Sequence, residues 1–251
     1  MCTVTYLPIH AKGEKGSSND FILTSNRDEK TSRAAALPPS IHSLHGHDLI
    51  FPQDPKGKGS WIAASGSGTV VCLLNGAFFP HEVQPTYKHS RGLVVTDYFK
   101  YHDIEDFQAN YDFSEIEPFT LVIVENGGLS EIRWNGEETF RLDMDPQEPQ
   151  IWSSVTLYTP ETIAKRQYWF EEWLEHKDMV PTEIGDKIIG FHKFGGEGQA
   201  ENDILMNRND FLRTVSISSI QKSGERIHFL YSDLMNKKEY EVDLTLATVH
   251  E

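Results

Sequence analysis

The 251-residue sequence predicts an α+β fold in which antiparallel sheets are layered with helices. Apolar strand-like segments occur mostly in neighbouring pairs joined by polar turns, which is typical of β-hairpins. Helix-like segments are few and grouped in the centre of the chain, so strand and helix do not alternate as in a parallel βαβ fold. No internal repeat and no linker divides the sequence, and we expect a single domain over residues 1–251.

Strand signals dominate the first half of the chain. Apolar runs bounded by Gly, Asn or polar loops predict strands at residues 2–7, 21–25, 60–65, 69–75 and in both halves of 119–136. The polar loop AKGEKGSSND joins the first two strands, and this hairpin returns the charged tetrad at 26–29 toward the N-terminus. Asn126-Gly127-Gly128 marks the tip of the 119–136 hairpin.

Two other segments of the first half have different patterns. Residues 31–58 contain several prolines and scattered polar residues, so we expect mostly loop there. Residues 91–101, RGLVVTDYFKY, predict a helix.

The second half predicts two helices followed by strands. Residues 151–157 form a further strand, and 159–176 give the clearest helix signal, with Pro160 in the first turn and an apolar face. Residues 182–194 predict another helix. Three closing strands are expected at residues 211–221, 226–234 and 238–246. The total is about ten strands and three helices.

Composition and charge exclude several classes of function. The net charge of −15 repels phosphate, which argues against partners such as nucleic acid and anionic membranes. No run approaches the roughly 18 apolar residues of a membrane-spanning helix, and the N-terminus lacks the pattern of a signal peptide. We therefore expect a cytoplasmic protein whose two cysteines, Cys2 and Cys72, are reduced.

Cys2 directly follows the initiator Met and is a candidate nucleophile. Removal of Met1 would place a thiol and a free α-amine on one residue. The α-amine has an ordinary pKa of about 7.7–8.0, and a partly ionised thiol is strongly nucleophilic, so one residue would supply nucleophile and base. The alternative is a small apolar residue that begins a strand.

Polar residues at strand ends are further candidates. In the tetrad Asn26-Arg27-Asp28-Glu29, a guanidinium near the thiol would favour thiolate and a carboxylate could hold the ammonium group. The alternative is a solvated turn. Asn75 ends an apolar strand and could donate to an oxyanion, or simply begin an ordinary Asn-Gly turn.

The remaining Cys and His residues give weaker signals. Cys72 lies within an apolar strand and is expected to be buried packing. His42, His45 and His47 could ligate a metal on a loop, but no regularly spaced Cys, Asp or Glu supports them. We interpret them as surface histidines and predict no metal.

Several short segments together resemble the NRDE family, the relatives of the transport-and-Golgi-organisation proteins. They are MCT at the start, TSNRDE, GSW, the strand ending in Asn75, SSVTLYTPE and RTVSISSIQ. This family is similar to the N-terminal nucleophile hydrolases, so the resemblance implies a four-layer αββα sandwich. Its nearest described enzymes, penicillin V acylase and choloylglycine hydrolase, begin with Met-Cys-Thr and cleave non-peptide amide bonds with the freed cysteine.

The resemblance also implies roles for individual residues. The acylases carry an R-N-x-D element; here Asp28 matches its Asp, Ser25 stands at the Arg position, and Arg27 is displaced by two residues. Asn75 matches the oxyanion-hole Asn, and Ser154 replaces a second Asn.

The other implied site residues lie in three separate segments. Arg213 is the counterpart of a late Arg in the acylases. We expect Asn26, Glu29 and Trp61 to contact the substrate.

The sequence therefore predicts a cysteine hydrolase that cleaves an amide or thioester bond of a small acylated substrate without a cofactor. The alternative is a non-catalytic carrier on the same scaffold, because members of the family have been linked to haem trafficking and to lipid or acyl-CoA balance. Under that alternative haem is a ligand, and HSLHGH would offer an axial imidazole. A third hypothesis is a domain that binds a protein partner.

Overall fold

The computed structural model describes residues 3–9, 19–176 and 183–246. Within them, two seven-stranded antiparallel sheets face each other. The first sheet contains, in spatial order, β10 (Gln150–Ser153), β1 (Thr3–Pro8), β2 (Phe21–Lys30), β12 (Leu212–Ser223), β13 (Arg226–Asp233) and β14 (Lys238–Thr245), with β11 (Asn207–Arg208) paired to β12. The second runs through β3 (Leu37–Leu44), β4 (His47–Gln53), β5 (Ile62–Ser65), β6 (Val70–Asn75), β7 (Phe119–Glu125), β8 (Gly128–Trp134) and β9 (Thr139–Met144).

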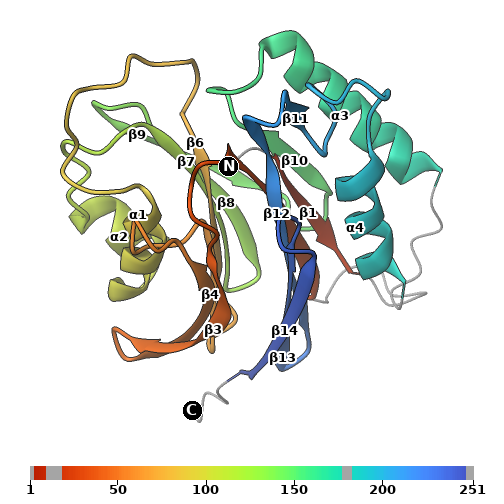
Figure 1. Ribbon diagram of the computed structural model, residues 1–251. Coiled ribbons are helices and arrows are strands. Elements are labelled where there is room, and N and C mark those ends of the chain that lie inside the picture. Colours follow the sequence, from red (N-terminus) through yellow and green to blue (C-terminus); the bar gives the residue numbers. More distant parts are fainter. Residues whose placement is uncertain (1–2, 10–18, 177–182, 247–251) are drawn as a thin grey trace.

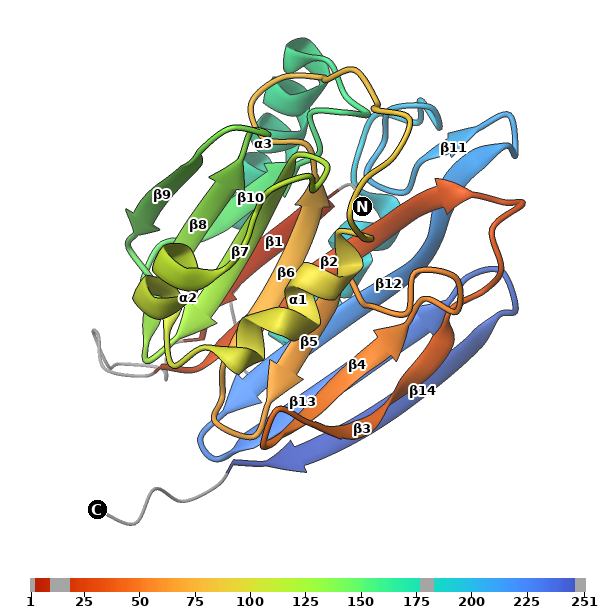
Figure 2. The same cartoon turned by 90° about the vertical axis from the view of Figure 1, so that its left-hand side faces the viewer.

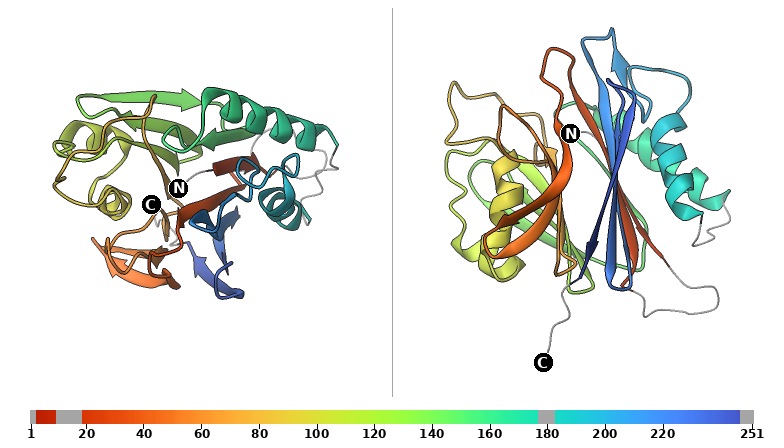
Figure 3. Two further views of the ribbon diagram at one scale, coloured as in Figure 1. Left: turned by 45° about the horizontal axis from the view of Figure 1, so that its top comes forward. Right: turned by 60° about the horizontal axis from the view of Figure 1, so that its bottom comes forward.

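Helices cover the outer face of each sheet. The helices α1 (Gly92–Asp97) and α2 (Ile104–Asn110), with the short 3₁₀ turn η1 (Tyr98–Lys100), lie outside the second sheet (Figure 2). The helices α3 (Pro160–Glu175) and α4 (Ile184–Phe194) lie outside the first sheet (Figure 1). The order helix, sheet, sheet, helix is visible in Figure 3 and confirms the predicted four-layer α+β sandwich.

Two apolar layers hold these elements together. The larger one fills the space between the sheets, with Val4, Leu23 and Cys72, and continues on the outer face of the second sheet under α1 and α2. The smaller one, with Leu7 and Ile22, lies between the first sheet and α3 and α4. Successive side chains of a strand point to opposite faces, so β1 and β2 contribute to both layers. Their residues are buried on either face, and this alternation also decides where the polar residues of β2 point.

The structure corrects the predicted elements in several places; the strand predicted at 151–157, for example, ends at Ser153 as β10. The strand β2 continues through the charged tetrad to Lys30, so Asn26–Glu29 is strand and not a turn. Residues 31–58, predicted as mostly loop, contain the hairpin β3–β4. The strand β9 and the helix α2 were not predicted. The predicted helices at 91–101, 159–176 and 182–194 are confirmed in position by α1, α3 and α4.

The β3–β4 hairpin was predicted as loop because its segment contains several prolines. The strand β3 is the edge strand of its sheet, and Pro38 and Pro39 lie where its pairing with β4 is irregular, between Leu37 and Ser40. An edge strand tolerates proline because one side of its backbone needs no ladder partner. His45 and Gly46 make the tight turn with φ of 56° and 83°. No helix in the described part of the chain has the length and apolar composition to cross a bilayer.

Candidate active site

The site is built around the first described residue, Thr3. In the first sheet Thr3 pairs with Asn26 of β2 on one side and with Ser153 of β10 on the other. Cys2, the predicted nucleophile, lies outside the described residues. Arg27 follows Asn26 in the sequence, and Ser154 follows Ser153. Both are predicted site residues. The structure thus brings three separate segments together at the start of β1.

The strand β2 divides the predicted tetrad between its two faces. Arg27 and Glu29 border a cavity on the side of the second sheet. Asn26 contacts α4 and Asp28 contacts the turn before α3, both on the helix side. This division follows from strand alternation. Adjacent residues of the motif therefore have different surroundings.

A cavity of about 700 Å³ lies between the end of β2 and the second sheet. Four predicted residues line it: Arg27, Glu29, Trp61 and Asn75. The other described lining residues are Arg33, Asp54, Lys56, Gly59, Ser60, Leu73, Tyr87, His89, Ser90, Arg91, Gly92 and Glu117. Its volume is typical of small-molecule sites, which span roughly 300–1,000 Å³. Four of the predicted residues therefore meet at one cavity.

Arg27 is a buried cation held between an aromatic ring and carboxylates. Its guanidinium carbon lies 4.5 Å from the centre of the Trp61 ring, and its Nη2 donates to Asp54 Oδ2 at 2.6 Å. Glu29 is farther away, at 4.0 Å. Burial lowers the pKa of Arg27, while the charges of Asp54 and Glu29 oppose that effect. The side chain is 5% exposed, so its orientation is fixed by these partners.

Asp54 joins two arginines at the cavity wall. Arg33 Nε donates to the same Oδ2 at 2.7 Å, and the Gly57 N–H donates to Oδ1 at 2.6 Å. Burial alone would raise the pKa of Asp54, but the hydrogen bonds from Arg33 and Gly57 outweigh burial and lower it. The bridge Arg27–Asp54–Arg33 therefore connects β2 to the segment before β5 with an ionised carboxylate.

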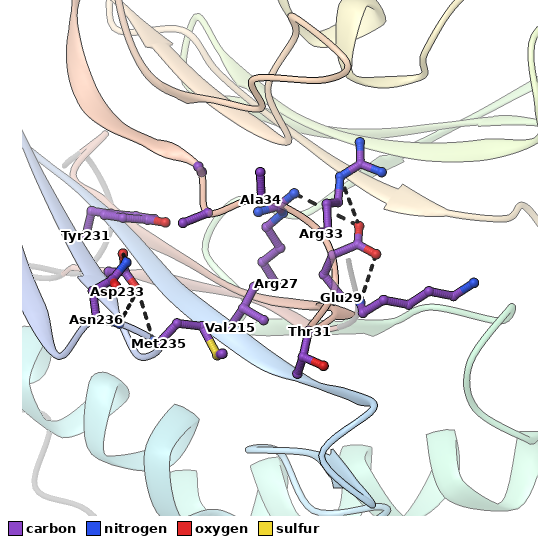
Figure 4. Close-up of a pocket in the computed structure, with 13 residues that line it drawn as sticks. Arg27, Glu29, Thr31, Arg33, Ala34, Val215, Tyr231, Asp233, Met235 and Asn236 are labelled. Carbon is purple, nitrogen blue, oxygen red and sulfur yellow. Dashed lines mark hydrogen bonds and ion pairs between the residues drawn. The ribbon is translucent and has the colours of Figure 1, made fainter.

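Arg27 also borders a second, smaller cavity of about 150 Å³. Figure 4 shows Arg27, Glu29 and Arg33 on one side of it and Tyr231 and Asp233 on the other. The three charged residues from β2 and the following turn form a partition between the two cavities.

Asn75 ends β6 in a backbone segment that side chains hold in place. Ser154 Oγ donates to the Asn75 carbonyl at 2.8 Å, Thr120 Oγ1 to the Gly76 carbonyl at 2.9 Å and Arg133 Nη1 to the Ala77 carbonyl at 2.9 Å. The amide side chain of Asn75 forms no hydrogen bond with another described residue. The segment is therefore a fixed support for a donor at the cavity wall. The Ser154 hydroxyl contacts this support and Thr156.

Asp28 lies behind β2 with two hydroxyl partners. Tyr158 donates to its Oδ2 at 2.7 Å and Thr214 to its Oδ1 at 2.6 Å. Arg213, next to Thr214, pairs with Glu29 across the strands and approaches Asp210 at 3.7 Å. Neither Asp28 nor Arg213 is among the described residues that line the 700 Å³ cavity.

Arg166 was not predicted, although it is the largest fully buried side chain of the described residues. It donates to Thr3 Oγ1 and to the carbonyls of Asn202 at 3.1 Å and Asp203 at 2.5 Å. Its guanidinium lies 3.6 Å from the centre of the Tyr158 ring. Arg166 therefore ties α3 to the start of β1. Only its helical spacing of three and four residues from Ile163, Trp169 and Phe170 could have pointed to it.

Asn26 connects β2 to α4 and does not reach the cavity. Its Nδ2 donates to the carbonyls of His192 and Ile204, at 3.2 and 2.8 Å. Its Oδ1 is 2.8 Å from His192 Nδ1, and Thr5 Oγ1 is 2.8 Å from Nε2. An amide oxygen only accepts, so Nδ1 carries the proton and Nε2 accepts from Thr5. Burial and the charge of Arg166 lower the pKa of His192 to about 3.

The remaining Cys and His candidates lie elsewhere. Cys72 is fully buried between the sheets, and burial raises the pKa of its thiol to about 12. His42 packs on Phe51 in the β3–β4 hairpin, with ring centres 4.2 Å apart, and bonds to Ser40. In the described chain, no three His, Cys, Asp or Glu residues are grouped so that they could hold a metal ion.

Solved structures of two hydrolases share this fold. A cysteine-to-alanine mutant of the conjugated bile acid hydrolase from Clostridium perfringens matches with a TM-score of 0.56 and 10% identity, over 97% of this chain and 92% of that one. An arginine-to-leucine variant of that enzyme gives 0.53 and 10%, over 96% and 92%. The Caenorhabditis elegans orthologue of N-acylethanolamine-hydrolyzing acid amidase gives 0.56 and 10%, over 87% and 92%.

The sequence itself identifies the family. The chain belongs to the Transport and Golgi organisation 2 family, whose sequence model matches residues 1–195. No curated protein sequence matches the chain. The strands β12 to β14 lie beyond the matched region, yet β12 pairs with β2 at the site.

Proposed function

We propose that the chain is a cysteine hydrolase that acts, after removal of Met1, on an amide or thioester bond of a small acylated substrate. The observation that carries this proposal is the convergence of Arg27, Trp61 and Asn75 on one cavity. Thr3, which follows Cys2 in sequence, pairs with the residue next to Arg27. The fold supports the proposal, and the mutated cysteine of the bile acid hydrolase stands second in that chain, as Cys2 does here.

The proposed reaction uses the two groups of a freed Cys2. The α-amine accepts the thiol proton, and the thiolate attacks the substrate carbonyl carbon. Asn75 donates to the oxygen that becomes negative in the tetrahedral intermediate. When the carbon–nitrogen or carbon–sulfur bond breaks, the ammonium group returns its proton to the leaving group. Water then attacks the acyl-cysteine, releases the acid and restores the thiol.

The surrounding charges have separate roles in this proposal. Arg27 favours the thiolate, and its own position is fixed by Asp54 and Trp61. Asp28 holds the ammonium group, and its carboxylate is oriented by the Tyr158 and Thr214 hydroxyls. Glu29 and Trp61 contact the substrate in the cavity. Arg213 stabilises charge at the edge of the site, where it pairs with Glu29 in register.

A carrier of hydrophobic ligands is the second candidate. It is favoured by Ser154, which stands where the related acylases have a second Asn and donates to a backbone carbonyl. In a carrier the cavity binds and releases a ligand such as haem or an acylated molecule without covalent chemistry.

The test compares Cys2→Ala with Cys72→Ala, which changes the chain's other cysteine. Mass spectrometry of the wild-type protein should show loss of Met1, and incubation with N-acyl amides and thioesters should show an acyl adduct on Cys2. We expect Cys2→Ala to lower kcat at least about a thousandfold and Cys72→Ala to change it less than about threefold. Equal turnover by Cys2→Ala and wild type, or an active protein that retains Met1, would exclude a freed Cys2 as the nucleophile.

A further inference from the structure

A second, apolar concavity lies outside the charged cavity. This groove, of about 480 Å³, is bounded by Phe78, Phe79 and Pro80 on one side and by the start of α3 on the other. In Figures 1 and 2 the segment after β6 and the start of α3 lie at the same end of the sandwich. Its volume lies within the range of small-molecule sites.

The groove differs from the charged cavity in composition. Among the described residues that line it none is charged, although 24% of the whole chain is charged. The 700 Å³ cavity, by contrast, is lined by Arg27, Glu29, Arg33, Asp54, Lys56, Arg91 and Glu117. An ionic group placed in the groove would lose its hydration and find no charged partner, which costs free energy. An apolar chain has no such desolvation cost. The groove therefore selects an apolar ligand.

Both walls of the groove are held in place before any ligand enters. On one wall, Arg133 donates to the Ala77 carbonyl and lies 5.0 Å from the Phe78 ring, which also meets Phe140 edge-on at 5.1 Å. The Phe79 side chain beside it is 79% exposed. A large apolar side chain left in water at the rim of an apolar concavity is typical of a binding site.

The other wall is one face of a helix. Pro160, Ile163, Ala164 and Gln167 of α3 line the groove, and their spacing of three and four residues places them on one side of the helix. Further along α3, Trp169 and Phe170 are buried against the first sheet. These later residues anchor the helix, and its first two turns border the groove.

The groove adjoins the candidate active site through a third cavity. A narrow cavity of about 120 Å³ has Asn75 and Ser154 on its wall and shares Val155, Ile163 and Gln167 with the groove. Asn75 in turn lines the charged cavity. Asn75 thus stands at the junction of a charged space and an apolar one, and a molecule that spans the junction would place its central bond beside Asn75.

We propose that this groove is the acyl-chain subsite, so that the substrate carries an apolar acyl chain whose carbonyl lies at Asn75. This inference rests on the proposed function, because it assigns the carbonyl to the bond that Cys2 attacks. The leaving group then lies in the charged cavity. The two spaces on either side of Asn75 separate the two halves of one substrate.

The test measures binding without turnover in the Cys2→Ala protein. The probes are straight-chain N-methyl amides with acyl chains of four to twelve carbons, titrated by calorimetry. Each added methylene in the groove should tighten binding about fourfold until the groove is filled. Phe79→Ser in this background should weaken the longest probe about tenfold and the four-carbon probe less than twofold. Ala164→Trp, which fills the groove from the helix side, should remove the dependence on chain length.

The matched control is Phe194→Ser, which removes an equally exposed Phe, 83% exposed, from the end of α4. It should leave the whole series unchanged. An affinity independent of chain length, or a dependence that survives both Phe79→Ser and Ala164→Trp, would overturn the subsite. If the affinity did not depend on chain length but the wild-type protein hydrolysed short-chain amides, the subsite would be excluded and the proposed hydrolase activity would be retained. A chain-length dependence in a protein that hydrolyses none of the probes would retain the groove and exclude the hydrolase.

Discussion

The two faces of β2 place one four-residue motif in two different environments. On the helix side, Asn26 satisfies the carbonyls of His192 and Ile204 and has no contact with the cavity. On the side of the second sheet, Arg27 lies between Trp61 and Asp54 and lines the cavity. The contacts of Asn26 are between neutral groups and are fully buried. The contacts of Arg27 are ionic and border the cavity.

This difference separates structural from functional residues within the motif. Asn26 attaches α4 to the first sheet, next to the residues that pair with the start of β1. Arg27 and Glu29 are placed to act on a ligand. A substitution at Asn26 should therefore change stability, and one at Arg27 should change the chemistry of the site. Substitutions on the two faces of β2 test that separation.

The largest expected effect is on the helix side. Asn26→Ala removes three hydrogen bonds and leaves two buried carbonyls and the His192 N–H without partners. We expect the free energy of unfolding to fall by about 3 kcal/mol, because each buried group left unsatisfied costs about 1–3 kcal/mol. Urea denaturation monitored by tryptophan fluorescence measures the change.

The control for this prediction is Asn110→Ala at the exposed end of α2, where one side-chain bond to Asp106 is lost. It should cost less than about 0.5 kcal/mol. The folded fraction of Asn26→Ala should bind cavity ligands as wild type does. A loss of affinity without a loss of stability would place Asn26 among the binding residues and contradict the separation.

The next effect is the pH dependence of stability that His192 causes on the helix side of β2. His192 has a folded pKa of about 3, below the ordinary value of about 6.5. Between these values the unfolded chain binds a proton that the folded chain does not, so stability falls as pH falls. The contribution is at most about 1.4 kcal/mol per pH unit. In His192→Gln, whose amide can still donate to Asn26 and accept from Thr5, this dependence should disappear.

The measurement is the free energy of unfolding of both proteins between pH 6.5 and 4.5, above the range in which most carboxyl groups titrate. The wild-type curve should be steeper, and the two should differ most at the acidic end. Parallel curves would mean that His192 is not buried in its neutral form.

The sequence predicted the elements that carry strong local signals. The hairpins β5–β6 and β7–β8 and the helix α3 have apolar runs, glycine turns and a proline at the helix start. The strand β9 escaped prediction because it lies at a sheet edge with mostly exposed side chains. The helix α2 has one usable signal, Asp103, whose side chain accepts from the Asp106 N–H at the cap.

The candidate site was predictable only in part, for a geometric reason. Trp61 and Asn75 lie next to or at a strand end, and Arg27 belongs to a charged tetrad after an apolar run, so all three could be named from sequence. The opposite orientation of Asn26 follows from alternation, but only once the tetrad is known to be strand. Tyr158 and its partner Asp28 are 130 residues apart, and their contact depends on how α3 packs on the first sheet. No local pattern encodes that packing.

The smallest expected effect on stability lies on the cavity side. Arg27→Gln should lower the free energy of unfolding by about 1–2 kcal/mol. Stacking on Trp61 and one ionic hydrogen bond are lost, but Asp54 keeps Arg33 and the Gly57 N–H as partners. The same variant should move the midpoint of Cys2 alkylation by iodoacetamide to higher pH by about one unit, because a nearby cation favours the thiolate.

Arg91→Gln is the matched control for Arg27→Gln. Arg91 lines the same cavity and pairs with Glu117 at 3.0 Å, so its loss removes the same charge from the cavity at a different place. If Arg27 acts through its position beside the start of β1, only Arg27→Gln shifts the alkylation midpoint. Equal shifts in both variants would mean that the thiol responds to the net charge of the cavity. No shift in either variant would remove Arg27 from the proposed mechanism and leave it as part of the wall.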